Sequence, residues 1–165
     1  MGTGCAARLR SVVERAASRL AAISDADSAR APAPGKWSPR ELVGHLVDSA
    51  SNNHQRFVRA RFREDLEFPG YDQDEWVEAQ AYQEASWEDL VALWRTFNLH
   101  IAHVMDHTPE AVRLREVRRH NLDEIGWQTV PKSEPTTLDA FMADYVGHLE
   151  HHLRTLLGPL PESTE

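Results

Sequence analysis

Nine of the 165 residues are histidines, and two of them have a spacing that suits metal binding. His148 and His152 are four residues apart in a segment with the hydrophobic period of a helix, so their side chains lie one above the other on one face. Two imidazoles placed in this way can bind one ion at about 2.1 Å from each nitrogen. A third ligand from a facing helix would leave coordination positions open for water or substrate, as in catalytic metal sites.

His45 is the candidate for that third ligand, because it lies on the flank of the inward face of another expected helix. The spacing alone leaves two interpretations open. The three histidines either bind an ion or are hydrogen-bonded residues of the core. The segment that begins at His148 is not the H-E-x-x-H motif of zinc proteases, because no glutamate directly follows that histidine.

A rival group consists of His100, His103 and His107, which share one flank of a third expected helix away from the centre of its apolar stripe. Two of them could bind a surface ion, but a solvated helix face is the preferred interpretation. The remaining histidines suggest no partner, and His151 is expected to point away from the inward face.

Four segments have the periodicity of amphipathic helices, and none shows the alternation of a strand. With their caps and stops, they run from about Ala6 to Ile23, Ser38 to Arg63, Ser86 to Thr108 and Thr136 to Gly158. The second begins with a capping-box pattern, in which Ser38 is followed by Pro39 and then by Glu41. Helices of this kind bury their apolar stripes most simply in a four-helix bundle, so we predict an all-α domain spanning residues 1–165.

A long connector, residues 64–85, separates the second and third of these helices. A connector of this length is usually functional or contains a short helix, which we expect near residues 74–80. It also permits a crossing between helices that is not a simple up-and-down turn.

The composition excludes several classes of function. The formal net charge of -8 argues against a broad nucleic-acid-binding surface, and no apolar run approaches the length of a membrane helix. The single cysteine excludes an internal disulfide framework and fits a cytoplasmic protein. The sequence contains no convincing Ser/His/Asp or Cys/His nucleophile set, which is consistent with chemistry at a metal.

Two motifs resemble those of the DinB/YfiT-like superfamily of bacterial metal-binding four-helix bundles. The stretch WSPRELVGHLVDS, residues 37–49, resembles the opening motif, and YVGHLEHHLR, residues 145–154, resembles the closing H-x-x-x-H motif. Residues 72–76 resemble the middle of such proteins, so the likeness spans nearly the whole chain. It implies that His45, His148 and His152 bind a divalent metal ion in an up-down-down-up bundle, commonly a homodimer. Zinc and nickel are the leading candidates, although imidazole ligands alone do not choose between metals.

The resemblance also implies a choice of activities. Relatives include thiol-dependent S-transferases and isomerases, and others described as hydrolases. An ion with open positions lowers the pKa of a bound thiol or water and thus supplies a nucleophile. We therefore expect an enzyme with a small-molecule substrate and, for thiol transfer, a low-molecular-weight thiol. A non-catalytic or stress-associated metal-binding dimer and a plain helical interaction module are the alternatives.

Three polar residues, Ser49, Asn53 and Arg56, extend the face of the helix that carries His45. They could line a substrate pocket, in which Arg56 would attract an anionic group such as a carboxylate of the thiol. The alternative is a dimer contact or an internal polar network.

Further residues are candidates for supporting positions. Asp48 and Asp144 could orient an imidazole by accepting its distal N–H, or could be ordinary surface acids. Trp37 and Trp76 are expected to pack at the helix ends, and Trp127 could cover the mouth of the bundle.

Overall fold

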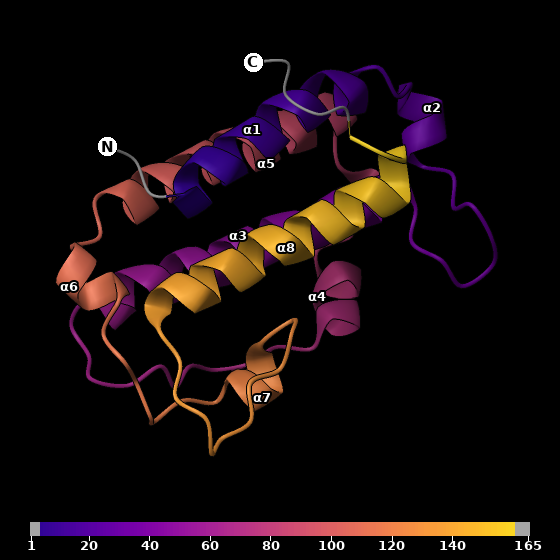
Figure 1. Cartoon of the computed structure of the whole chain (residues 1–165). Helices are drawn as coiled ribbons and strands as arrows, with labels where there is room; N and C mark the ends of the chain where they lie inside the picture. The colour runs from indigo at the N-terminus through magenta and orange to yellow at the C-terminus, as the bar shows by residue number, and fades with distance from the viewer. Residues whose placement is uncertain (1–3, 161–165) are drawn as a thin grey trace.

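The computed structural model describes residues 4–160, which form a bundle of four long helices (Figure 1). The long helices are α1 (Gly4–Ala21), α3 (Pro39–Ala60), α5 (Trp87–Asp106) and α8 (Leu138–Leu157). The short ones are α2 (Asp25–Ser28), α4 (Gln73–Ala79), the 3-10 helix η1 (Tyr82–Glu84), α6 (Glu110–Arg113) and α7 (Leu122–Ile125). Within the described residues, strand-like pairing is limited to two isolated bridges, Leu66 with His120 and Val117 with Thr136.

Local sequence chemistry accounts for the start of α3 and the end of α8. The predicted capping box is confirmed, because the Ser38 hydroxyl accepts from the Glu41 N–H while the Glu41 carboxylate accepts from the Ser38 N–H at 2.8 Å. α8 stops at Gly158, which has a φ of 74°. α3 ends somewhat earlier than expected, because the N–H of Arg61 bonds back to Val58 in a tightened last turn.

The contacts at the helix ends establish the up-down-down-up order. The Trp87 indole at the start of α5 donates to the carbonyl of Leu20 at the end of α1, so these helices are antiparallel. The Arg19 guanidinium donates to the carbonyl of Leu157, which brings the ends of α1 and α8 together. The Arg40 guanidinium near the start of α3 donates to the carbonyl of Gln83 just before α5, so α3 and α5 start at the same end and the chain between them crosses back along the bundle (Figure 1).

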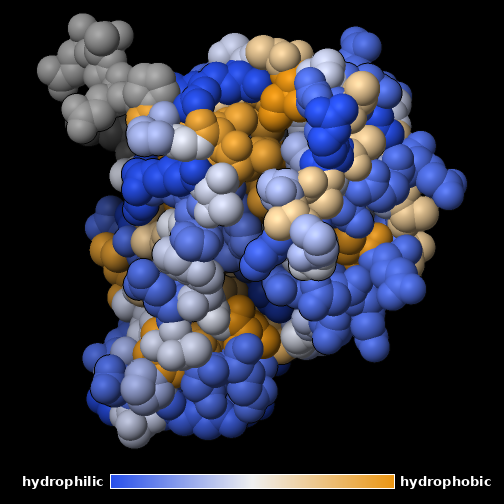
Figure 2. Space-filling model, turned by 90° about the vertical axis from the view of Figure 1, so that its right-hand side faces the viewer, coloured by the Kyte–Doolittle hydropathy of each residue, from blue (hydrophilic) through white to orange (hydrophobic). Residues whose placement is uncertain are grey.

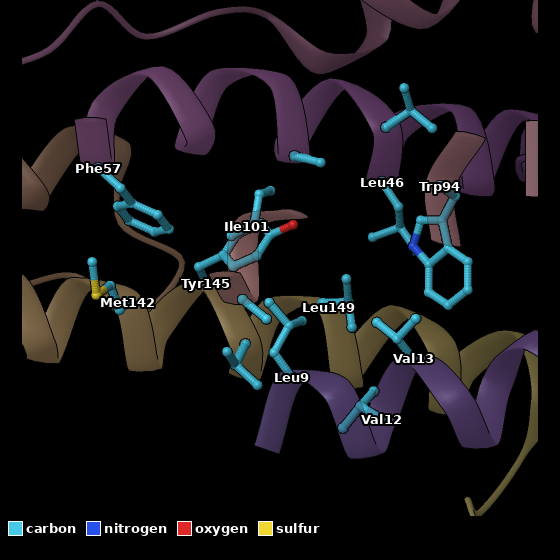
Figure 3. Close-up of a cluster of buried hydrophobic side chains, with 14 of the residues drawn as sticks. Leu9, Val12, Val13, Leu46, Phe57, Trp94, Ile101, Met142, Tyr145 and Leu149 are labelled. Carbon is cyan, nitrogen blue, oxygen red and sulfur yellow. The ribbon is translucent and has the colours of Figure 1, made fainter. Parts of the chain in front are cut away.

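The core lies between the four long helices, and each contributes side chains that point toward the others (Figure 3). α1 supplies Leu9 and Val13, α3 supplies Leu46, α5 supplies Trp94, and α8 supplies Leu149, all of them buried. The periodic apolar stripes are thus satisfied by mutual burial, which fixes the rotation of each helix.

On the face shown in Figure 2, hydrophilic residues surround separate hydrophobic patches. No helix in residues 4–160 has both the length and the apolar character required to cross a bilayer.

Candidate metal centre

Three imidazoles converge between α3 and α8. The Nε2 atom of His148 lies 3.3 Å from Nε2 of His45 and 3.0 Å from Nε2 of His152. Ligand nitrogens at about 2.1 Å from one ion are separated by about 3.0–3.4 Å for octahedral to tetrahedral angles. These two distances suit an ion shared by the rings, and the ligand atoms of all three histidines lie within 4.8 Å of one another. No other group of at least three candidate ligands in residues 4–160 converges so closely.

Burial lowers the pKa of all three imidazoles and so keeps them uncharged, as metal ligands must be. The pKa of His45 is lowered to about 4, that of His148 to about 3 and that of His152 to about 4, in each case mainly because burial disfavours the charged ring. Neighbouring histidines lower these values further. At neutral pH the rings are uncharged, so nitrogen lone pairs are available without displacement of a proton.

His45 is the most enclosed of the three, with an exposed fraction of 2%. The ring of Trp37, just before α3, packs on it with a centroid distance of 5.0 Å. This contact is the packing role expected for a tryptophan at a helix end, and it places an aromatic wall beside the candidate metal centre. The Nδ1 atom of His45 is buried and has no hydrogen-bond partner among the described residues.

A cavity of about 430 Å³ opens from the histidines along α3. Its walls include His45 and His148 together with the three residues predicted to line a substrate pocket, Ser49, Asn53 and Arg56. The Ser49 hydroxyl lies 3.5 Å from Nδ1 of His148. The expected polar face thus forms one continuous wall that begins at the histidines.

Sequence reasoning missed Tyr71, which lies in the connector before α4 and also lines this cavity. Its hydroxyl forms a hydrogen bond with Ser49, and burial raises its pKa to about 12. The phenol therefore stays protonated and can donate a hydrogen bond into the cavity. No periodicity marks the connector, so no sequence pattern distinguishes this position.

Asp48 supports the site differently from the expectation. It does not bond to an imidazole; its Oδ1 atom accepts from the Tyr82 hydroxyl at 2.6 Å and from the Gln80 side chain at 2.7 Å. It is also not a surface acid, because only 2% of it is exposed. Gly44, one turn earlier, leaves room for the Tyr82 ring, since a Cβ there would lie 2.2 Å from a ring carbon. The hydrogen bond from Tyr82 to Asp48, together with the space at Gly44, fixes the connector between α3 and α5 against α3.

Asp144 likewise bonds to the backbone and not to a histidine. Its two carboxylate oxygens accept from the N–H groups of Trp127 and Gln128 at 2.9 and 2.8 Å. The loop held in this way lays the Trp127 ring against His148, with a centroid distance of 6.4 Å, and over Gly147. Trp127 consequently forms part of the cavity wall at the mouth of the bundle.

The other histidines of the described residues contribute no ligand atom to this cluster, although the centroid of the His151 ring lies 5.3 Å from that of His152. His100 and His103 on α5 and His107 at its C-cap are exposed, as expected for a solvated face. The ring of His54 on α3 lies tilted against that of His100, with a centroid distance of 5.2 Å. His151 is exposed and contacts Trp127, which agrees with the prediction that it points off the inward face.

Fold and site together define an all-helical bundle with a candidate three-histidine metal centre beside a polar cavity. A model of the DinB superfamily matches residues 8–156, and the chain belongs to this superfamily. This confirms the resemblance carried by the two histidine motifs.

One solved structure with the same fold is that of YfiT from Bacillus subtilis, described as a probable metal-dependent hydrolase with an unusual four-helix bundle topology. The TM-score is 0.73, with 93% of this chain and 83% of that chain covered. The identity is 21%, so this similarity concerns the fold. No curated protein matches the sequence significantly.

Proposed function

We propose that this protein is a metal-dependent S-transferase, in which a divalent ion bound by His45, His148 and His152 activates a low-molecular-weight thiol for attack on a small electrophilic substrate. The observation that carries the proposal is the convergence of three neutral imidazoles, two of which, those of His45 and His148, line the 430 Å³ cavity. Zinc and nickel suit this donor set. When bound, such an ion lowers the pKa of a thiol or water and makes it a nucleophile.

The carboxylates near the centre favour thiol transfer over hydrolysis. Hydrolysis of an ester or amide profits from a general base or acid beside the ion, usually a free carboxylate. Both oxygens of Asp144 are occupied by backbone N–H groups. Tyr82 and Gln80 bond the Oδ1 atom of Asp48, and although its Oδ2 atom has no partner among the described residues, Asp48 does not line the cavity. A thiol whose pKa is lowered by the ion is already deprotonated near neutral pH and needs no general base.

Hydrolysis is the second candidate, and the fold shared with YfiT supports it. A non-catalytic or stress-associated metal-binding dimer is the third. Homodimerisation is implied by the motifs of the superfamily and is tested by light scattering of the purified protein.

The decisive experiment compares untagged wild-type protein with His148→Ala, each loaded with zinc or nickel. Thiol consumption is followed with chlorodinitrobenzene as the electrophile, and ester hydrolysis with nitrophenyl acetate in the absence of thiol. We expect thiol-dependent turnover that His148→Ala abolishes. Ester hydrolysis without thiol would favour the second candidate. Bound metal without either activity, across a panel of electrophiles, would favour the third.

A further inference from the structure

Arg56 is a buried cation without a counter-ion. Its exposed fraction is 6%, and no carboxylate of the described residues forms an ion pair with it. Its guanidinium donates to the carbonyl of Pro69 at 2.9 Å and, more weakly, to the Asn53 side chain at 3.4 Å. Both acceptors are neutral, and burial lowers the pKa of this arginine. Desolvation of an unpaired charge costs free energy, which a bound anion would recover.

The other buried arginine of the same helix shows the usual arrangement. Arg40 is 8% exposed, and its guanidinium pairs with the Asp25 carboxylate at 2.6 Å. It also donates to the Ser28 hydroxyl and to the carbonyl of Gln83. Arg40 therefore has a structural role, whereas the fold leaves Arg56 unneutralised at the cavity wall.

The acids that share the cavity wall with Arg56 are bound elsewhere. Asp72 accepts from the N–H groups that begin α4, Asp144 holds the Trp127 loop, and Glu124 pairs with Lys132. On its other side, Arg56 borders a hollow of about 310 Å³ that is also lined by Arg59. Among the residues that line the cavity, Arg56 is the one arginine or lysine, and its charge is therefore available to a ligand bound there.

Arg56 lies far enough from the histidines to hold a different part of a ligand. The two ends of the polar wall, His45 and Arg56, are separated by about three helical turns, on the order of 16 Å between Cα atoms. The arginine side chain spans part of this length. A ligand could therefore have its reacting end at the histidines and an anionic group at Arg56.

We propose that the thiol of the proposed reaction carries a carboxylate that pairs with Arg56, with the Tyr71 hydroxyl and the Asn53 side chain as neutral neighbours. The inference rests on the proposed function. A carboxylate matches the guanidinium in a bidentate manner, and its single negative charge balances the one cation available.

The test measures binding of thiol probes to the zinc-loaded protein by isothermal titration calorimetry. The probes are ω-mercaptocarboxylates of increasing chain length, each compared with the ω-mercaptoalcohol of equal length. We expect the carboxylate to bind at least about tenfold more tightly at an optimal length, as one charge-assisted hydrogen-bond pair provides. Equal affinity of acid and alcohol at every length would overturn the proposal, and this comparison requires no variant.

Arg56→Gln should reduce the preference for the carboxylate to within about twofold, whereas Arg61→Gln, a change at the exposed end of α3, should retain it. A preference that survives in folded Arg56→Gln would assign the anion to another residue. Failure of the proposed thiol transfer can be distinguished from failure of the Arg56 site. If only the thiol transfer is wrong, alkanoates without a thiol should still bind metal-free wild type more tightly than metal-free Arg56→Gln.

Discussion

The Nε2 atoms of His45 and His148 lie 3.3 Å apart, although the two residues belong to different helices, α3 and α8. These helices come from opposite halves of the chain and meet only in the folded bundle (Figure 1). An ion shared by the two rings would therefore bind the folded state in preference to the unfolded chain and stabilise it.

The first prediction concerns this coupling. Wild-type protein should retain about one divalent ion per chain, and zinc at 100 times its dissociation constant should stabilise the metal-free form by about 2.7 kcal/mol. His148→Ala should lose both the ion and the stabilisation. Elemental analysis and thermal unfolding with and without zinc measure these effects. His103→Ala, at an exposed position of α5, is the control and should behave as wild type.

The second prediction concerns pH. In the folded metal-free protein the pKa of His148 is about 3, whereas in the unfolded chain it is near 6.5. Below pH 6.5 the unfolded chain therefore binds more protons, and the free energy of unfolding should fall as the pH decreases from about 6.5 toward 4. Above pH 7 the ring is neutral in both states and contributes no pH dependence.

Urea denaturation at several pH values checks this sign. The pKa values of Asp48 and Asp144 are raised by burial and act in the opposite direction, so the informative quantity is the difference between wild type and His148→Gln. The stability of the variant should depend less steeply on pH between 4 and 6.5. Identical slopes would show that burial does not depress the pKa of His148.

The third prediction tests how the connector is fixed to α3. In Gly44→Ala the new methyl group would lie 2.2 Å from the Tyr82 ring, so ring or helix must shift. We expect a loss of about 1–3 kcal/mol, as for other overpacked sites. Gly4→Ala, where a Cβ meets no atom within 4 Å, is the control and should be neutral or slightly stabilising. Equal stability of both variants would mean that Tyr82 does not depend on the space at Gly44.

The helices and the helix faces that carry the three histidines were predictable because local rules determine them, whereas the grouping of the three as metal ligands was implied by the resemblance. Ser38 and Glu41 form a capping box whatever the tertiary context, and the apolar period fixes which face of α8 carries His148 and His152. The position of His45 followed from the same period on α3. The resemblance to a known superfamily then supplied the bundle topology, which helix periodicity alone does not determine.

The residues around the histidines were less predictable. Tyr71 reaches the cavity, and Tyr82 reaches Asp48, from a connector without periodicity, where only the tertiary path decides which side chains point inward. The partners of Asp48 and Asp144 were missed for a related reason. Sequence spacing suggested nearby imidazoles, but the carboxylates bond to segments that are distant in the chain.

The last prediction concerns Trp127, which covers one side of the candidate metal centre. Its ring packs on His148 and His151 but contributes no ligand atom to the three-histidine cluster. Trp127→Ala should therefore leave the amount of bound zinc unchanged while opening the cavity wall to solvent. We expect a chelator to remove zinc several-fold faster than from wild type, as followed with a colorimetric zinc indicator. Trp76→Ala is the matched control, because Trp76 is similarly exposed, at 38% against 41%, and packs on Tyr71. If both variants released zinc at the wild-type rate, access to the histidines would be limited elsewhere, and Trp127 would not form the barrier.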